Sequence, residues 1–134
     1  MPQRLGQHFL INKSAIKKII ESLELKREEA VIEIGSGKGA LTFPLIKECQ
    51  KIGCKIIAIE KDQKLAVSLK LLAVRNNLQI EIIEEDALKI ISELTKTCKL
   101  KAKSYKLVGN IPYYITGKIL RILSKLENKP ELAV

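Results

Sequence analysis

The 134-residue sequence lacks any uninterrupted apolar run of the roughly 18 to 20 residues that a membrane-spanning helix requires. Its first residues, MPQRLGQHFLINKS, contain no apolar signal core, so we expect a cytoplasmic protein with no membrane partner. The three cysteines, Cys49, Cys54 and Cys98, form no CxxC pair and are odd in number. This pattern favours free thiols in a reducing cytosol.

Internal repeats and linkers rich in Ser, Gly or Pro are also missing, which predicts a single domain. Apolar residues make up 46% of the chain, so it should bury a core. The formal charge of +9 favours a polyanionic partner such as nucleic acid. Between residues 89 and 106 six lysines accompany one acid, Glu93, although a compositional drift toward lysine would give a similar charge.

Apolar periodicity predicts strands that alternate with helices. We expect strands at 30–35, 54–60, 78–85 and 105–110, and helices at 14–25, 40–51, 62–76, 87–96 and about 115–127. Asn12 suits the cap of the first helix, and Pro44 is compatible with the second only in its first turn. The alternation predicts an α/β fold with a parallel sheet whose ligands bind beyond the carboxyl ends of the strands.

The segment EIGSGKGALT follows the first predicted strand. Gly35, Gly37 and Gly39 would let the chain turn sharply and bring bare backbone close to a ligand, although a tight strand-to-helix turn alone could use them. The spacing is not that of a P-loop, so Lys38 is not expected to bind a nucleoside triphosphate. Ala40 could complete a dinucleotide fingerprint, so this loop alone leaves NAD open.

Two acids close the next two predicted strands. Glu60 is placed to accept hydrogen bonds from both hydroxyls of a ribose, and Asp86 to accept one from an adenine amino group. Either residue could instead be a solvated loop acid or a helix cap. Taken together with the glycine loop, they describe a pocket for an adenosine that carries a small charged tail.

The fourth predicted strand ends in GNIPYYITG, where an amide, a proline and two tyrosines fall within five residues. With GQHFL at 6–10, EIGSGKGALT at 33–42, AIEKD at 58–62, EDAL at 85–88 and NIPYYIT at 110–116, the chain resembles the ribosomal RNA adenine N6-dimethyltransferases along almost its whole length. The resemblance implies a Rossmann-like, doubly wound, mainly parallel sheet of the class I methyltransferase type. It also implies S-adenosyl-L-methionine as cofactor, no metal, and small-subunit ribosomal RNA as substrate.

The resemblance also assigns site residues. The implied cofactor contacts are His8, Leu10, Gly35, Gly37, Glu60, Asp86 and Asn110. His8 and Leu10 would close over the cofactor, with His8 as a polar contact and not a general base. Gly35 and the loop backbone would contact its methionine end, Glu60 its ribose and Asp86 its adenine.

Asn110, Pro112 and Tyr113 are the expected catalytic residues. The Asn110 side-chain oxygen and a carbonyl near Ile111 or Pro112 would accept the two amino hydrogens of the target adenine, turning the nitrogen lone pair toward the methyl group. Pro112 would hold these acceptors still. Tyr113 would stack on the extruded base, which is typically worth ~1–3 kcal/mol. Tyr114 could stack or pack beneath the loop.

The sequence departs from the family at Ser36, where proline or alanine is usual, and at Glu85, where glycine is common. It stops at KPELAV, which resembles the start of a fifth strand. We therefore expect residues 1–134 to be the N-terminal part of the cofactor-binding domain, incomplete after the fourth or fifth strand and without the family's helical RNA-gripping domain. If it is complete, the protein is expected to be a monomer.

Three alternatives stay open at this point. The substrate could be large-subunit ribosomal RNA. Enzymes that methylate DNA adenine or protein glutamine more often carry the motif N-P-P-Y, so Ile111 argues against these two substrates. The chain could also be a non-catalytic RNA-binding ribosome assembly factor that has kept the fold.

Overall fold

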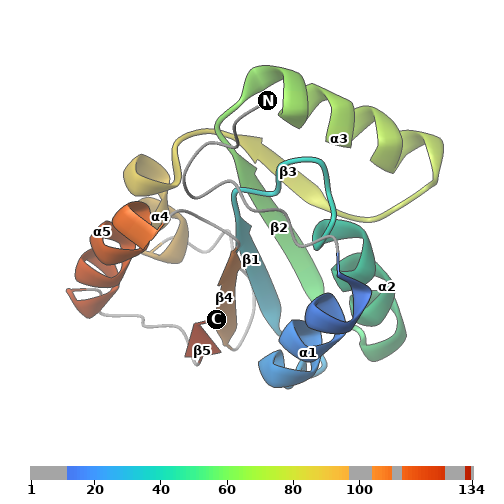
Figure 1. The fold of residues 1–134 in the computed structure, drawn as a ribbon, viewed down its shortest axis with the longest axis horizontal. Coiled ribbons are helices and arrows are strands. Elements are labelled where there is room, and N and C mark those ends of the chain that lie inside the picture. Colours follow the sequence, from blue (N-terminus) through green and yellow to red (C-terminus); the bar gives the residue numbers. More distant parts are fainter. Residues whose placement is uncertain (1–11, 97–103, 110–112, 126–131, 134) are drawn as a thin grey trace.

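A parallel sheet organises the chain in the computed structural model, which describes residues 12–96, 104–109, 113–125 and 132–133. In this described part the strand order is β3-β2-β1-β4-β5, and each neighbouring pair is parallel (Figure 1). The strands are β1 (Ala30–Ile34), β2 (Lys55–Glu60), β3 (Glu81–Glu84), β4 (Tyr105–Gly109) and β5 (Leu132–Ala133). The strand order reverses between β1 and β4, which makes the carboxyl ends of these strands the expected binding position.

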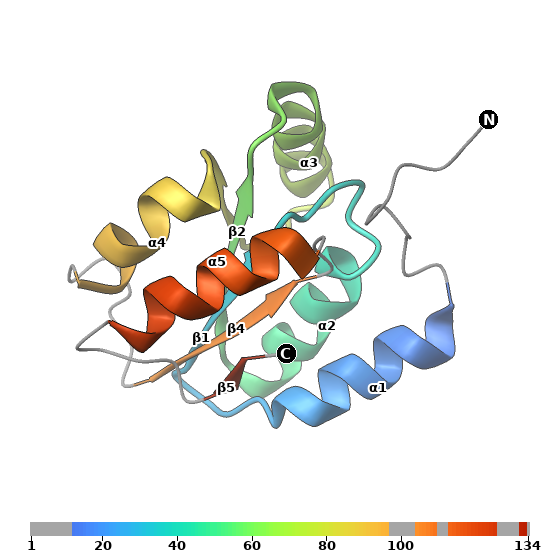
Figure 2. The same cartoon turned by 60° about the vertical axis from the view of Figure 1, so that its left-hand side comes forward.

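Helices cover both faces of this sheet. They are α1 (Lys13–Leu23), α2 (Thr42–Ile52), α3 (Gln63–Arg75), α4 (Ala87–Lys96) and α5 (Tyr113–Ser124). Figures 1 and 2 show α1, α2 and α3 on one side of the sheet and α4 and α5 on the other. Within the described ranges, none of the helices has the length and apolarity needed to cross a bilayer.

The alternation of side chains along the strands divides the core into two clusters. In β1, Ala30, Ile32 and Ile34 face α4 and α5 and pack with Ile91, Leu94, Ile119 and Leu123. Val31 points the other way, toward α1 and α2, where it packs with Ile16, Leu23, Leu45 and Ile46. Glu33 shares the orientation of Val31, since side chains two positions apart lie on the same face of a strand. A carboxyl group is thereby placed on the α2 side of the sheet.

The predicted strands and helices are all confirmed, with boundaries that differ by up to three residues. Asn12 caps α1, with its Oδ1 accepting from the Ser14 and Ala15 amides at 2.8 and 3.3 Å. Pro44 lies in the first turn of α2, as its missing amide requires. The third strand is shorter than the predicted 78–85, and α5 begins at Tyr113, not at about 115. Leu132–Ala133 pairs with β4 as a short fifth strand.

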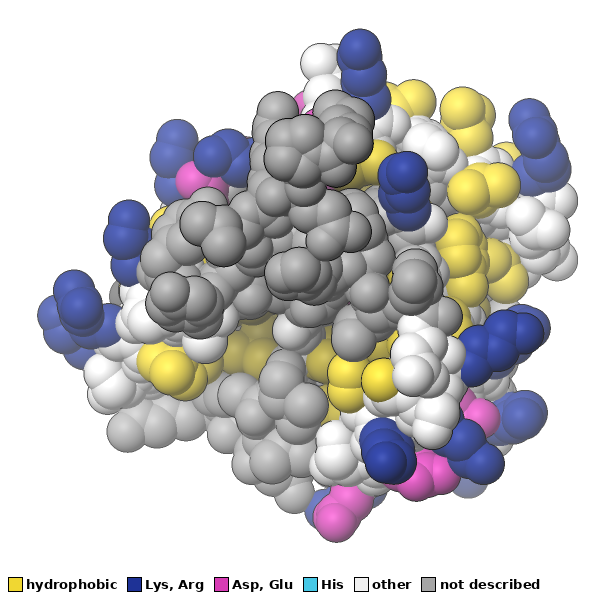
Figure 3. All heavy atoms as spheres, viewed as in Figure 1, with side chains coloured by type: hydrophobic (Ala, Val, Ile, Leu, Met, Phe, Trp, Pro, Cys, Tyr) yellow, Lys and Arg dark blue, Asp and Glu magenta, His cyan; other side chains and the backbone are white. Residues whose placement is uncertain are grey.

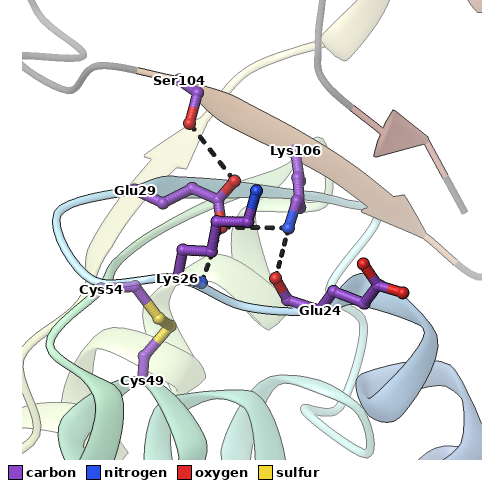
Figure 4. Close-up of polar contacts among 7 residues, drawn as sticks. All are labelled: Glu24, Lys26, Glu29, Cys49, Cys54, Ser104 and Lys106. Carbon is purple, nitrogen blue, oxygen red and sulfur yellow. Dashed lines mark hydrogen bonds and ion pairs between the residues drawn. A yellow bond between two sulfur atoms is a disulfide. The ribbon is translucent and has the colours of Figure 1, made fainter.

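The amino ends of β1 and β4 are joined by a buried ion pair (Figure 4). Lys106 Nζ lies 3.2 Å from Glu29 Oε2, with both side chains almost fully buried. The same ammonium donates to the Glu24 carbonyl at the end of α1, and Glu29 also accepts from the Lys26 amide and the Ser104 hydroxyl. Because each charge has several partners, its burial is compensated. This cluster fastens α1, β1 and β4 together on the edge opposite the predicted site.

The expectation of three free thiols was wrong for two of the cysteines. Cys49 and Cys54 form a disulfide that links the last turn of α2 to the residue before β2. Gly53 makes this possible by ending α2 in the left-handed conformation, at φ +95°, which reverses the chain and returns Cys54 to the helix. The absence of a CxxC motif did not exclude a disulfide, because Cys49 and Cys54 are bonded across the end of a helix at a separation of five residues.

Candidate active site

The glycine loop lies at the carboxyl end of β1, between β1 and α2. Gly35, Gly37 and Gly39 all have positive φ, at +71°, +57° and +90°. A side chain in this conformation would be strained at each position, which explains the three glycines. Among the described residues, a Cβ added at Gly37 would meet only the Gly35 carbonyl oxygen, at 4.0 Å, which leaves space above the backbone in this part of the structure. The predicted close approach of a ligand to this loop is therefore sterically possible.

Glu60, the last residue of β2, fixes the middle of the loop. Its Oε1 accepts a 2.7 Å hydrogen bond from the Gly37 amide, and its Oε2 accepts a 2.9 Å bond from the Asp62 amide. The side chain is 7% exposed, so these charge-assisted bonds form largely out of solvent. The carboxylate thus joins the glycine loop to the start of α3, while each oxygen keeps further acceptor capacity.

Ser36 supplies an unpaired polar atom inside the same loop. Its side chain is buried, and its Oγ has no hydrogen-bond partner within the described ranges. A buried hydroxyl without a partner is unusual, since burial of a polar group without a hydrogen bond costs free energy. A polar ligand seated on the loop would offer this hydroxyl a partner. In the sequence, Ser36 is notable only as a departure from the family pattern.

Asp86 follows β3 at the same edge of the sheet and caps α4. Its Oδ1 accepts from the Leu88 amide at 3.0 Å, which realises the capping role left open by the sequence. Its Oδ2 lies 4.0 Å from Lys61 Nζ, and this second oxygen has no part in the cap. Glu85 brings β3 and β2 together through its amide, which donates to the Glu60 carbonyl at 3.1 Å. Asp86 and Glu60 therefore follow adjacent strands at one edge.

Glu33 is a buried acid that sequence analysis did not select. It is 2% exposed, and its Oε1 accepts a 2.5 Å hydrogen bond from the Thr42 hydroxyl at the start of α2. Burial raises the pKa of Glu33 to about 7, the Thr42 hydrogen bond lowers it, and the nearby Glu60 carboxylate raises it. The bond ties the two ends of the glycine loop together. The signal in the sequence was a carboxylate within the otherwise apolar AVIEI.

The remaining predicted site residues are not placed by this structure. His8, Leu10, Asn110 and Pro112 lie outside the described residues, and of Tyr113 only the backbone is described, in the first turn of α5. The structure therefore brings together Gly35, Gly37, Glu60 and Asp86. In the part of the chain that is described, no three His, Cys, Asp or Glu side chains are grouped to bind a metal ion.

The strand order, the glycine loop after β1 and the acid at the end of β2 define a Rossmann-like fold of the class I methyltransferase type. Solved structures agree. An S-adenosylmethionine-dependent O-methyltransferase from Thermotoga maritima matches 84% of this chain and 41% of its own, with a TM-score of 0.61 and 19% identity. A dimethyladenosine transferase from Plasmodium falciparum matches 94% of this chain and 42% of its own, with a TM-score of 0.74 and 26% identity.

Sequence comparison identifies the family. The family model described as ribosomal RNA adenine dimethylase matches residues 2–131, so the chain belongs to that family. A "Ribosomal RNA small subunit methyltransferase A" from Dehalococcoides mccartyi is 42% identical over 134 residues, covering 97% of this chain and 42% of the relative. The protein of that name from Clostridioides difficile is also 42% identical, over 87% of this chain and 38% of its own. The chain thus spans about two fifths of the length of these relatives.

Proposed function

We propose that this chain binds S-adenosyl-L-methionine and belongs to an enzyme that methylates N6 of adenosine in small-subunit ribosomal RNA, giving dimethyladenosine. The observation that carries the proposal is the buried Glu60 carboxylate, which holds the glycine loop through the Gly37 amide in a chain of this family. An acid at this position can take both hydroxyls of a ribose while the loop backbone faces the rest of the ligand.

The described residues fit such a cofactor. The Glu60 oxygens have acceptor capacity left for the ribose, Asp86 Oδ2 is outside the helix cap and can accept from the adenine amino group, and the buried Ser36 hydroxyl has no partner among the described residues. Among the described residues Gly37 leaves open space above its backbone, and Gly35 shares the positive φ of the same loop, so the loop backbone is proposed to face the methionine end. His8, Leu10 and Asn110 complete the proposed contacts. When bound, the cofactor supplies an electrophilic methyl group on a sulfonium.

The chain's own residues would activate the acceptor. The target nitrogen is a weak nucleophile because its lone pair is delocalised into the adenine ring. Asn110 and a carbonyl near Ile111 or Pro112 would accept its two hydrogens, Pro112 would keep the acceptors in place, and Tyr113 would stack on the base. No strong general base is needed, since the methylated nitrogen becomes acidic and loses its proton to water. Alignment can contribute up to ~7–11 kcal/mol.

The wider setting is part of the same proposal. We assign residues 1–134 to the cofactor-binding methyltransferase domain, with ribosomal RNA in the small subunit as substrate and the cytoplasm as location. The enzyme is proposed to act as a monomer without a metal. The charge of +9 supports a nucleic-acid partner, and the names of the similar relatives support the small subunit.

Calorimetric titration with S-adenosyl-L-methionine tests the proposed role of Glu60 in cofactor binding. Glu60→Gln should weaken binding strongly, because one of the two anionic acceptors for the ribose and the loop is replaced by an amide donor. Glu84→Gln is the matched control: Glu84 is the register partner of Glu60 on β3, carries the same charge and is exposed. The Glu84→Gln variant should bind S-adenosyl-L-methionine with the same affinity as the wild type.

Methyl transfer is tested with labelled cofactor and ribosomal subunits that lack the modification. Incorporation into small subunits, and not into large subunits, is the expected result, with dimethyladenosine as the product on nuclease digestion. Absence of any heat with the cofactor would refute the proposal in favour of an assembly factor. Binding of cofactor with incorporation only into large subunits would contradict the proposed substrate.

A further inference from the structure

Three cations follow one face of α5 and the turn residue that comes directly after it. Lys118, Arg121 and Lys125 are exposed and line a hollow of about 260 Å³, together with Leu88 of α4 and Ile122. Their spacing of three and four residues places them on the same side of the helix. Figure 3 shows Lys and Arg side chains around the molecule, including its left-hand edge, where Figure 1 places α4 and α5. We call these three residues the α5 basic stripe.

The stripe differs from an ordinary solvated helix face. Residues 113–125 contain no acid at all, whereas solvated faces generally mix both signs. Favourable interaction with the helix dipole would account for a cation in the last turn, such as Arg121, but not for Lys118 in the middle of the helix. The three charges therefore repel one another without compensation from their own helix.

A second groove in the molecule provides the contrast. It lies between α1 and α2, has a volume of about 620 Å³, and is larger than the hollow beside α5. Its lysines, among them Lys13, Lys17 and Lys51, alternate with three glutamates, including Glu48, which pairs with Lys51 at 3.6 Å. Positive charge is largely offset by carboxylates in this groove, whereas the described lining of the α5 hollow contains three cations and no acid over an apolar floor.

The stripe also starts close to the proposed site. Helix α5 begins at Tyr113, immediately after residues 110–112 and the carboxyl end of β4. With a rise of about 1.5 Å per residue, Lys118 lies about 7.5 Å along the helix from Tyr113, and Lys125 about 18 Å. A nucleic-acid strand in duplex geometry carries a phosphate about every 3.4 Å of axis, so the roughly 10.5 Å between Lys118 and Lys125 would pass about three phosphates.

We propose that the α5 basic stripe binds the sugar–phosphate backbone of the RNA strand that presents the target adenosine. The inference rests on the proposed function, because it takes RNA as the partner and the carboxyl edge of the sheet as the place of the extruded base. The cations contact successive phosphates, and the apolar floor made by Leu88 and Ile122 accommodates a ribose or a base edge. Such contacts position a strand without reading its sequence.

The test is the salt dependence of RNA binding. A fluorescein-labelled single-stranded RNA with a small-subunit ribosomal sequence is titrated with protein at several salt concentrations, and binding is followed by fluorescence anisotropy. The variant Lys118→Gln/Arg121→Gln/Lys125→Gln should reduce the slope of log K against log salt by about 2, since each phosphate contact to a single strand contributes about 0.7. The matched control, Lys13→Gln/Lys17→Gln/Lys51→Gln, removes the same charge from the α1–α2 groove and should leave the slope within about 0.5 of the wild type.

Calorimetry with S-adenosyl-L-methionine and the midpoint of thermal unfolding are measured for all three proteins. Cofactor affinity should be unchanged in both triple variants, because neither touches the glycine loop or Glu60. The proposal is overturned if the α5 variant keeps the wild-type slope, if the control lowers it equally, or if the wild-type protein does not bind the RNA. Failure of the proposed function is seen separately, as absence of cofactor binding by the wild type.

Discussion

Glu33 gives the chain a stability that should depend on pH in an unusual direction. Burial raises the pKa of this carboxyl from its ordinary 4.5 to about 7. The folded protein therefore holds a proton between these values that the unfolded chain has released. Stability from the neutral form is fully present below pH 4.5 and is lost as the pH rises to about 7. Over this interval, at about 1.36 kcal/mol per pH unit, the loss amounts to about 3 kcal/mol.

The substitution Glu33→Gln keeps the shape of the side chain and removes its ionisation. The amide oxygen can still accept from Thr42, so the link between β1 and α2 is preserved. The free energy of unfolding is measured by urea denaturation at intervals between pH 4.5 and 8.5, for the variant and the wild type. The free energy of unfolding of the variant, minus that of the wild type, should rise by about 3 kcal/mol as the pH is raised from 4.5 to 8.5. It should change little above pH 7.5.

Subtracting the wild-type curve of unfolding free energy against pH from the Glu33→Gln curve removes the contribution of the groups that titrate alike in both proteins. The control Glu84→Gln also removes a carboxylate, but from an exposed position on β3, and it should not reproduce the gain expected for Glu33→Gln. A flat difference curve for Glu33→Gln over the whole range would refute the reasoning, because it would mean that Glu33 titrates alike in the folded and unfolded chain.

Three further predictions concern stability. Gly109→Ala should destabilise by about 1–3 kcal/mol in urea denaturation, because its Cβ would lie 2.7 Å from the Ile34 carbonyl oxygen. Gly117→Ala, whose added Cβ would have no described atom within 4 Å, should stabilise α5 by about 0.5–1 kcal/mol, and equal effects of the two substitutions would contradict this account. Lys106→Met should lower the free energy of unfolding by about 3–5 kcal/mol, because the Glu29 carboxylate is left buried without its cation. The double variant Lys106→Met/Glu29→Gln should recover part of this loss, and no recovery would contradict the buried ion pair. Mass spectrometry after alkylation without reductant should label one of the three cysteines, and reduction of the α2–β2 disulfide should cost about 2 kcal/mol; labelling of all three would exclude the bond.

The sheet and its order of elements could be predicted because apolar runs and turn residues determine them locally. The third strand was overextended for a tertiary reason. Leu78 and Ile80 read as strand residues, but the Leu78 amide donates to the Ala73 carbonyl at the end of α3, and Asn77 has φ +54°. Pairing with β2 begins only at Glu81. The chain is still completing the turn from the helix where periodicity already indicates a strand.

The positions of the two candidate acids could be predicted because they stand at strand ends, whereas charged residues in the middle of strands were not selected. Glu60 and Asp86 were found from their positions at strand ends, and both lie at the carboxyl edge. Glu33 and Lys106 lie inside apolar strands, where their partners, Thr42 and Glu29, depend on which face each side chain takes. A charged residue within a buried strand was the available signal, although its partner could be identified only from the packed structure.

The bond between Glu60 and the Gly37 amide has a thermodynamic consequence for ligand binding. The loop is held in shape by the protein itself, so a ligand does not have to order it on arrival. Less conformational entropy is lost in such an encounter, and more of the interaction free energy remains as affinity. The Glu60 carboxylate would then both hold the loop through the Gly37 amide and accept hydrogen bonds from the ribose. We therefore expect the free and cofactor-bound loops to superpose closely, and the association rate to be set by diffusion and orientation instead of by rearrangement of the loop.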